Sequence, residues 1–422
     1  MEGVHLLNGR FFSFVTILII SLLVAPITGN AESSTNTPEN GNDYPIILVH
    51  GLGGWGEGEM FDIKYWGGEH DTEAFLNDNE HETYAATVSP VASNWDRAVE
   101  LYHYIYGGEV DYGAAHAEEH GHDRYGRTYP GIYSEWDNEN KIHLVGHSMG
   151  GQTIRTMTEL VKNGSAEEIE YYENNPDEGI SPLFEGGKDW VHSITSVATP
   201  HNGSTFADED ELVPFIKEMV IHFASAAGVS QDHLVYDFKM DHWGLKRKDD
   251  ERFSTYMDRV MNSSIWESDD ISAYDLSTKG ADELNQWVDL QSDIYYFSYT
   301  GNATYRAPSG KYQPLVSMNP FMWGSSVHIG SYTREDSEPI IDESWWPNDG
   351  LVNVNSSKFP AEQENKSYGD NNVEKGVWNF HDEQYGWDHL DFIGLSLEHG
   401  VGLREINDMY LDMAEQLHDL PK

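Results

Sequence analysis

Residues 142–150 read IHLVGHSMG, and this stretch decides the fold. Ile142–Gly146 has the apolar composition of a buried strand, whereas Met149–Lys162 repeats apolar residues at helical spacing. The motif G-x-S-x-G lies between them and is typical of a sharp strand-to-helix turn that exposes a serine hydroxyl. Its glycines permit the tight turn, and the helix N-terminus stabilises developing negative charge. The pattern therefore predicts that Ser148 is a catalytic nucleophile.

Three further segments have the composition of buried strands and alternate with helical patterns. They are Pro45–His50 (PIILVH), Val191–Ala198 (VHSITSVA) and Tyr295–Tyr299 (YYFSY). Such alternation favours a mostly parallel central sheet flanked by helices. Together with the turn at Ser148, it predicts an α/β-hydrolase fold. Residues 44–422 contain no repeat and no evident linker, so we expect a single domain there.

A glycine-rich segment, HGLGG, follows the first of these strands at residues 50–54. In this position a glycine-rich turn can aim main-chain N–H groups at an oxyanion, and the residue after the nucleophile supplies a second donor. The expected donors are the N–H groups of Leu52 and Met149. An ordinary strand-to-helix loop is the alternative, and the nucleophile motif downstream favours the oxyanion hole.

In an α/β-hydrolase the catalytic acid and histidine follow the serine in that order. Asp349 lies in a turn with the sequence NDGLVN, and His389 lies in the sequence DHLD before an apolar stretch. The chain has 72 acidic residues and 20 histidines, so composition cannot choose among the candidates. From the residues alone, a turn aspartate and a surface histidine remain open.

The N-terminal region has the features of a secretory signal. An uncharged apolar run covers Phe11–Ile27, and the small residues Gly29 and Ala31 follow it. We expect a signal peptide over residues 1–31 and a flexible polar leader over residues 32–43; an uncleaved membrane anchor is the alternative. No later stretch is long and apolar enough to span a bilayer. The absence of cysteine tilts the source of a secreted protein toward a bacterium and leaves stability to packing or bound metal.

The charge balance is strongly acidic, with 72 acidic against 25 basic residues and a net charge of −47. This field disfavours nucleic acid and anionic membrane surfaces as partners. The acidic residues are scattered along the chain, which indicates a solvated surface suited to high salt, where screening reduces self-repulsion.

Several longer stretches, in order along the chain, carry a resemblance to a known family. They include EMFDIKYWGG (Glu59–Gly68), SNWDRA (Ser93–Ala98), VDYGAAH (Val110–His116), GRTYPG (Gly126–Gly131), SPLFEGG (Ser181–Gly187) and VYDFK (Val235–Lys239). With the motifs above, the chain resembles the thermophilic bacillus lipases and their staphylococcal relatives from about Tyr44 to the C-terminus. The resemblance implies a triad of Ser148, Asp349 and His389. One departure is that relatives often carry Ala and Gln where this turn has Gly146 and Met149.

The resemblance also implies a structural zinc ion in an insertion that covers roughly residues 55–125 together with residue 270. Mixed imidazole and carboxylate ligands suit tetrahedral Zn²⁺, and four protein ligands leave no open position for catalysis. The implied ligands are Asp71, His116, His122 and Asp270. Without the resemblance, the histidine-dense stretch at residues 115–122 would be interpreted as a solvated loop.

A calcium site beside the catalytic histidine is implied in a weakened form. Asp391 stands where the relatives have Glu, Ser396 and Leu397 replace an Asp-Pro pair, and Ser317 stands where a carbonyl ligand is contributed. Loss of one carboxylate weakens a site for a hard cation.

The relatives carry a helical lid in the region that matches residues 205–235. Here residues 212–229 form an apolar run with helical spacing. Considered alone, this run is equally typical of an ordinary core helix, and its sequence diverges from the relatives. A lid that moves to uncover an acyl-binding cleft is the expectation from the resemblance.

The expected activity is extracellular hydrolysis of triacylglycerol or another ester lipid at a lipid–water interface. A carboxylesterase or phospholipase that uses the same machinery is the main alternative. A third reading is a non-catalytic surface-binding protein on a hydrolase scaffold, and the complete triad argues against it.

Overall fold

The computed structural model describes residues 41–60, 63–208, 212–226, 236–369, 373–395 and 401–422. The predicted signal peptide and most of the predicted leader lie outside the described residues. Among the residues described, no helix combines the length and the apolarity that crossing a bilayer requires.

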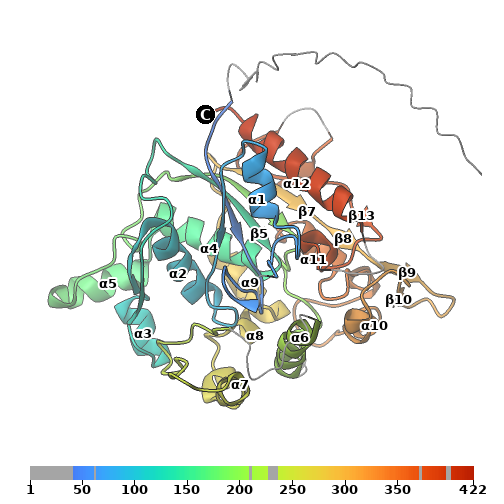
Figure 1. Ribbon diagram of the computed structural model, residues 1–422, viewed down its shortest axis with the longest axis horizontal. Coiled ribbons are helices and arrows are strands. Elements are labelled where there is room, and N and C mark those ends of the chain that lie inside the picture. The colour runs from blue at the N-terminus through green and yellow to red at the C-terminus, as the bar shows by residue number, and fades with distance from the viewer. Residues whose placement is uncertain (1–40, 61–62, 209–211, 227–235, 370–372, 396–400) are drawn as a thin grey trace, which may run out of the picture. The chain divides into compact units, whose positions relative to one another are not determined.

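A seven-stranded parallel sheet forms the centre of the described chain (Figure 1), with the strand order β11-β12-β7-β6-β5-β1-β2. Its members are β1 (Ile46–Val49), β2 (Thr83–Ala86), β5 (Ile142–His147), β6 (Val191–Val197), β7 (Tyr295–Tyr299), β11 (Asn365–Ser367) and β12 (Trp378–Phe380). Gly146 pairs with Val49 on one side and with Ser196 on the other. The carboxyl ends of β1, β5 and β6 therefore meet at one edge of the sheet, where ligands bind in open parallel sheets. The predicted α/β fold is confirmed.

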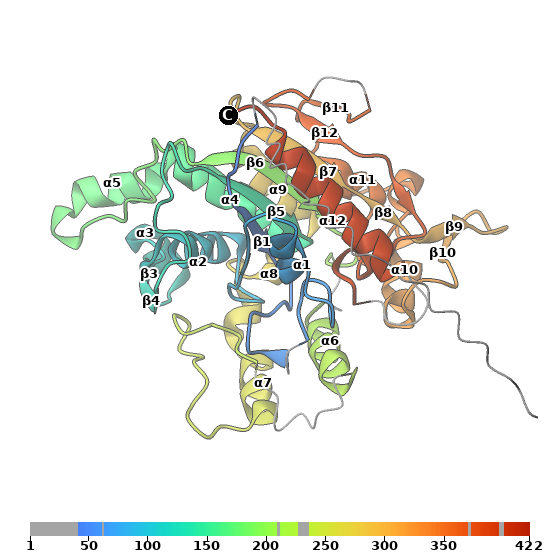
Figure 2. The same ribbon diagram turned by 45° about the horizontal axis from the view of Figure 1, so that its top comes forward.

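Helices cover both faces of this sheet, as Figure 2 shows. On one face, α2 (Asn94–Tyr106) and α4 (Met149–Asn163) pack against apolar side chains of β1 and β5 such as Ile47 and Leu144. On the other face, α12 (Leu403–His418) packs against the opposite side chains of the same strands. Because both faces are covered, β1, β5, β6 and β7 are buried along their whole length, and their few polar side chains are buried with them.

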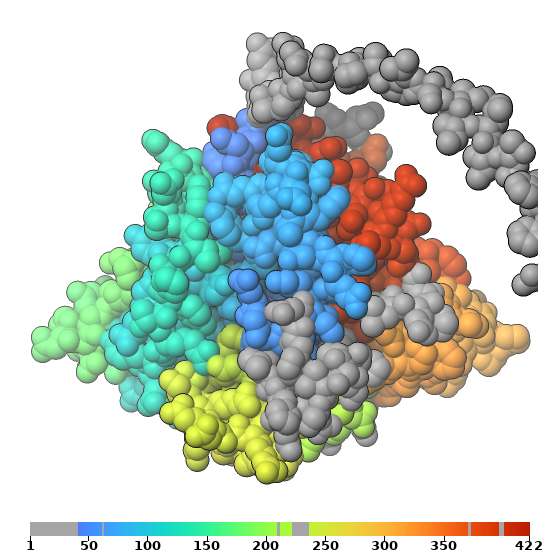
Figure 3. All heavy atoms as spheres, in the orientation of Figure 1, coloured from blue at the N-terminus to red at the C-terminus, as the bar shows by residue number. Residues whose placement is uncertain are grey.

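The first and last described segments of the chain lie together. Helix α1 (Thr72–Asp78) contacts α12, and Figure 3 shows the blue N-terminal residues beside the red C-terminal ones. Asn42 joins them further, because its side-chain amide donates to the carbonyl groups of Leu417 and Leu420 at 2.8 and 2.9 Å.

The remaining elements surround these layers. The α-helices are α3 (Ala114–His120), α5 (Ala166–Asn174), α6 (Leu212–Ala226), α7 (Phe253–Met261), α8 (Ser272–Asp275), α9 (Thr278–Trp287), α10 (Trp323–Ile329) and α11 (Val354–Lys358). The short 3-10 helices are η2 (Pro176–Glu178), η4 (Ser264–Glu267), η5 (Pro320–Met322), η6 (Glu343–Trp345) and η7 (Asp391–Ile393). The strands outside the main sheet are β3 (Gly108–Asp111), β4 (Tyr125–Tyr129), β8 (Gly301–Asn302), β9 (Thr304–Arg306), β10 (Tyr312–Pro314) and β13 (Gln384–Tyr385).

The four predicted strands coincide with β1, β5, β6 and β7 to within one or two residues, and the predicted helix after Ser148 is α4. The strands β2, β11 and β12 were not predicted. Part of the predicted lid segment is α6, whereas residues 209–211 and 227–235 lie outside the described residues.

Gly150 offers a test of how closely the start of α4 packs against the end of β1. A Cβ atom at this position would lie against the carbonyl oxygens of Val49 and His50, nearer than real Cβ atoms approach. We expect Gly150→Ala to lower the free energy of unfolding by about 1–3 kcal/mol, because rigid main chain would have to shift. Thermal and denaturant unfolding would measure the loss.

Gly324 in α10 provides the matched control, because a Cβ atom there meets nothing within 4 Å. Gly324→Ala should therefore keep or slightly raise the stability, since alanine favours a helix by up to about 1 kcal/mol over glycine. Equal stability of the two variants would contradict the described packing of Gly150.

Candidate active site

The turn between β5 and α4 holds Ser148 in an uncommon backbone conformation. Its φ is 57° and its ψ is −131°, a region that non-glycine residues rarely adopt. The turn is held because the Ser148 N–H donates to the carbonyl of Val197 at 2.8 Å. Gly51 lies close on the other side, where a Cβ atom would come within 2.6 Å of the Ser148 Cβ. The sharp strand-to-helix turn predicted from the motif is thus present, but Ser148 is buried rather than exposed.

Asp349 and His389 form the acid–histidine pair that the sequence analysis expected. The Nδ1 of His389 lies 2.8 Å from Oδ2 of Asp349, and both residues are buried. The other carboxylate oxygen of Asp349 accepts from the N–H groups of Leu351 and Val352 at 3.0 and 2.7 Å. An imidazole that donates from Nδ1 to this carboxylate keeps Nε2 available as a base. Ser148 and His389 line the same cavity.

That cavity is mainly apolar and is covered by α6. Leu212, Phe215 and Met219 of this helix line it at spacings of three and four residues, so one face of the helix lies over the serine. The end of the Met219 side chain lies against Gly53 of the glycine-rich loop. Three side chains of α6 therefore form part of the apolar wall of this cavity.

The glycine-rich loop and the start of α4 present the two expected oxyanion donors. Among the described residues, the N–H groups of Leu52 and Met149 donate to no other group. The buried guanidinium of Arg97 holds the loop in place, because it donates to the carbonyl of His50 at 2.5 Å and to Oγ1 of Thr153 at 2.9 Å. Arg97 was not predicted, although it lies within one of the stretches that carry the resemblance.

A second unpredicted element is a chain of hydrogen bonds beneath the site. The Gly51 N–H donates to the Tyr65 hydroxyl at 2.9 Å, and this hydroxyl lies 2.7 Å from Nδ1 of His147. The Nε2 of His147 lies 3.0 Å from the carbonyl of His389. Burial holds the pKa of His147 well below its usual range, so the ring is neutral: Nδ1 accepts from Tyr65 and Nε2 donates to the carbonyl. This hydrogen-bond chain joins Gly51 of the glycine-rich loop, the residue before Ser148, and His389.

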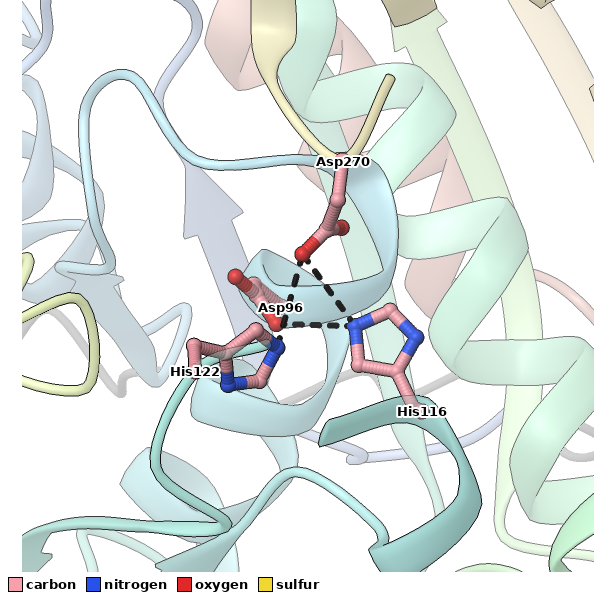
Figure 4. A group of neighbouring side chains, drawn as sticks. All are labelled: Asp96, His116, His122 and Asp270. Atoms are coloured by element: carbon pink, nitrogen blue, oxygen red, sulfur yellow. Dashed lines mark ion pairs between the residues drawn. The ribbon is translucent and has the colours of Figure 1, made fainter. Parts of the chain in front are cut away.

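Four side chains converge at a separate point, as Figure 4 shows: Asp96 on α2, His116 on α3, His122 just beyond α3, and Asp270 before α8. Their potential ligand atoms lie within 4.8 Å of one another. The Nε2 of His116 is 3.4 Å from an oxygen of Asp96 and 3.4 Å from an oxygen of Asp270, and His122 Nε2 is 3.5 Å from the same Asp270 oxygen.

These four atoms are buried and have no hydrogen-bond partner, although buried polar atoms are ordinarily paired. A tetrahedral ion with bonds of about 2.0–2.1 Å would separate its ligands by roughly 3.3–3.4 Å. The three distances of 3.4, 3.4 and 3.5 Å between the histidine nitrogens and the carboxylate oxygens agree with this value. Burial disfavours a charged His116, but the carboxylates of Asp270 and Asp96 prevail and raise its pKa to about 10. A cation would displace that proton and satisfy all four atoms, so the residues form a possible metal-binding group.

Neighbouring residues orient this metal-binding group. The Nδ1 of His122 lies 2.9 Å from the carbonyl of Asp123, which leaves Nε2 to face the common point. The second oxygen of Asp96 lies 2.7 Å from Nε2 of His242, and the indole of Trp95 stacks on His116 with ring centroids 4.9 Å apart.

Asp71, expected as the fourth ligand, is not a member of the group, and Asp96 stands in its place. Asp71 instead caps α1, where its carboxylate accepts from the N–H of Ala74 at 3.0 Å and lies 3.6 Å from Nζ of Lys64. Its side chain is partly exposed, whereas Asp96 is fully buried beside His116. The sequence did offer one indication of Asp96: it lies in SNWDRA, a stretch that carries the family resemblance, directly before the buried Arg97.

The residues expected for calcium are only partly described. Asp391 is buried, and its oxygens accept from the N–H groups of Asp388 and Val401 at 2.7 and 3.0 Å. Asp388, also buried, accepts from the N–H of Asn319 at 2.7 Å and so joins this region to the loop that carries Ser317. Ser396 and Leu397 lie outside the described residues.

Comparisons with known proteins find similarity along most of the chain. A family model described as "Lipase-like, C-terminal domain" matches residues 42–421. The protein named Lipase from Staphylococcus hyicus is 40% identical over 406 residues, which make up 94% of this chain and 61% of that protein. The chain thus spans about three fifths of the length of that relative. The predicted resemblance to staphylococcal lipases is confirmed.

Two solved structures are also similar. The structure of EstA from Clostridium botulinum has a TM-score of 0.83 and 46% identity, and the match covers 91% of this chain and 89% of that one. The structure of lipase 1 from Pelosinus fermentans has a TM-score of 0.81 and 47% identity, with 90% of this chain and 100% of that one covered.

The Tyr65 hydroxyl provides a test of the hydrogen-bond chain beneath the site. Tyr65→Phe leaves the Gly51 N–H and Nδ1 of His147 without a partner, which should cost about 1–3 kcal/mol of stability. We also expect kcat to fall about ten-fold or more, because the catalytic histidine and the oxyanion loop lose their common support. Steady-state kinetics on a dissolved ester would separate kcat from KM.

Tyr296→Phe is the control, because this buried hydroxyl accepts from the N–H of Gln291 at 2.9 Å and does not line the cavity. It should lose stability with little change in kcat. If Tyr65→Phe kept the kcat of the unchanged protein, the hydrogen bonds through Tyr65 would have no part in positioning His389 or the glycine-rich loop.

Proposed function

Because the chain belongs to the family described as lipase-like, C-terminal domain, we propose that it is a triacylglycerol lipase with Ser148 as its nucleophile. One observation carries the proposal: Ser148 and His389 line one apolar cavity beneath α6, and His389 is paired with the buried Asp349. The serine and histidine can act on an ester bond, and the apolar walls suit a fatty acyl chain.

The proposed reaction follows from the positions of the groups. Ser148 Oγ attacks the ester carbonyl carbon while Nε2 of His389 takes the hydroxyl proton, and the carbonyl oxygen becomes an oxyanion. The N–H groups of Leu52 and Met149 stabilise this oxyanion. The C–O bond to the alcohol then breaks, and the imidazolium returns its proton to the leaving alkoxide. Water repeats the sequence on the acyl-serine and releases the fatty acid. Asp349 orients the imidazole and stabilises its positive charge.

A carboxylesterase or phospholipase with the same machinery is the second candidate. The apolar cover that Leu212, Phe215 and Met219 provide favours long acyl chains, and motion of α6 would have to admit them. Rates on emulsified long-chain triglyceride, dissolved short-chain ester and phospholipid would separate these activities. The complete triad argues against a purely non-catalytic binding protein.

We also propose that the enzyme acts outside the cell. This proposal rests on the apolar segment within residues 1–31, which we assign to a signal peptide, with a leader over residues 32–43 and one catalytic domain over residues 44–422. The net charge of −47 supports it, because such a surface suits saline surroundings and repels released fatty-acid anions.

We propose Zn²⁺ for the metal-binding group, since two imidazoles and two carboxylates at tetrahedral spacing are typical zinc ligands. Asp96, His116, His122 and Asp270 would hold it. With four protein ligands, the ion would cross-link α2, the region of α3 and the segment before α8 rather than act on substrate. A Ca²⁺ ion held by Asp391 is a separate proposal, supported by the buried carboxylate of Asp388 beside it.

The nucleophile is tested by Ser148→Ala. We expect ester hydrolysis to fall roughly 10⁴-fold or more, because no covalent intermediate can form, while cooperative unfolding is retained. Hydrolysis of a dissolved chromogenic ester would measure it. Full activity in this variant would refute the assignment of Ser148.

The metal-binding group is tested by Asp96→Asn, with Asp71→Asn as the matched control. We expect the protein purified without chelator to contain about one zinc per chain, and Asp96→Asn to lose it and to melt at a lower temperature. Asp71→Asn should keep the metal. Elemental analysis and thermal unfolding are the measurements, and chelation should lower the melting temperature more than the rate at mild temperature. Protein that contains no zinc would overturn the proposed metal.

A further inference from the structure

A long segment within the described chain is free of charge, although the protein as a whole is strongly charged. Residues 312–333, between Lys311 and Arg334, contain no Asp, Glu, Lys or Arg. Charged residues make up 23% of the whole chain, so a segment of this length would be expected to carry roughly five of them. The segment runs from β10 through η5 and α10.

This uncharged segment exposes large apolar side chains. Val316 is 85% exposed, Trp323 is 43% exposed and Val327 is 41% exposed. Trp323 and Val327 are four residues apart on α10, so they lie on the same face of the helix. The indole N–H of Trp323 donates to the carbonyl of Met318 at 3.0 Å, which ties this face to the loop that carries Val316. We call Val316, Trp323 and Val327 the landing surface.

The landing surface is continuous with the structure around the cavity. The ring of Phe321, two residues before Trp323, lies 4.9 Å from the ring of Phe215, which lines the cavity from α6. Met322, just before Trp323, packs beside Gly350, the neighbour of the catalytic Asp349. In Figures 1 and 2, α10 lies next to α6. A lipid surface touching α10 would therefore lie close to the helix that covers Ser148.

We propose that the landing surface docks the protein on an uncharged lipid–water interface, neutral or zwitterionic, beside the entrance to the cavity. This proposal rests on the proposed lipase function and specifies the surface that the enzyme recognises. Apolar side chains gain by leaving water for the interfacial region of a lipid layer, with aromatic rings favoured there. A net charge of −47 opposes contact with an anionic layer, and an uncharged segment is where that opposition is least.

The test uses the Ser148→Ala protein, so that lipid is not consumed, and measures cosedimentation with vesicles. We expect binding to phosphatidylcholine vesicles, and weaker binding when phosphatidylglycerol is added at low salt, recovering as salt screens the repulsion. Val316→Glu and the double change Trp323→Ser/Val327→Ser should each weaken phosphatidylcholine binding about ten-fold or more. Because Val316 is largely exposed, its replacement disturbs little packing, and thermal unfolding of each variant would verify the fold.

Tyr172→Ser is the control. This tyrosine is also exposed, at 37%, but it lies on α5, far from α10 in Figure 1, and its replacement should leave binding unchanged. The proposal is overturned if the landing-surface variants bind like the parent, if Tyr172→Ser loses as much, or if anionic vesicles are preferred at low salt. It is also overturned if Val316→Glu only dissociates a dimer in sedimentation without changing vesicle binding. Hydrolysis of a dissolved short-chain ester by the unchanged protein tests the proposed function separately.

Discussion

The left-handed backbone turn at Ser148 is the constraint on which the rest of the site depends. A serine in this conformation is strained, and it persists because β5 on one side and α4 on the other leave the chain no alternative. The turn brings the Ser148 side chain beside the loop at Gly51, where an added Cβ atom would lie 2.6 Å from the Ser148 Cβ. A side chain at Gly51, Gly146 or Gly150 would collide with neighbouring atoms, so the proposed nucleophile and the proposed oxyanion donors depend on one close arrangement of main chain.

The parts of the fold that follow from local patterns could be predicted from the sequence. β1, β5, β6 and β7 are rich in apolar and β-branched residues, and α4 has clear helical periodicity after the serine motif. The partners Asp349 and His389 could not be chosen by composition, because acids and histidines are abundant. The resemblance selected them, and in the structure the two side chains are hydrogen-bonded to each other at 2.8 Å. Strands such as β2 and β12 escaped prediction because they are short and contain few of the branched residues that typify strands.

Features that depend on long-range packing were missed. Asp71 and Asp96 each lie at the start of a helix, and only the folded chain reveals that Asp96 points inward to His116 while Asp71 caps its own helix. Tyr65 and His147 are 82 residues apart, so their hydrogen bond has no local signature. Both omissions concern buried polar groups, whose roles are decided by the partners that folding supplies.

The adjacency of Asp96 and Arg97 on α2 has a consequence for how the protein would fail on heating. Asp96 belongs to the metal-binding group, whereas the guanidinium of Arg97 donates to the carbonyl of His50 at the base of the glycine-rich loop. A rigid helix carries a displacement of its first turn to both neighbours at once. Warming that frees the carboxylate would thus also loosen the support of the His50 carbonyl at the base of the glycine-rich loop. In the proposed mechanism this loop supplies an oxyanion donor, so heating that releases Asp96 would also weaken stabilisation of the tetrahedral intermediate.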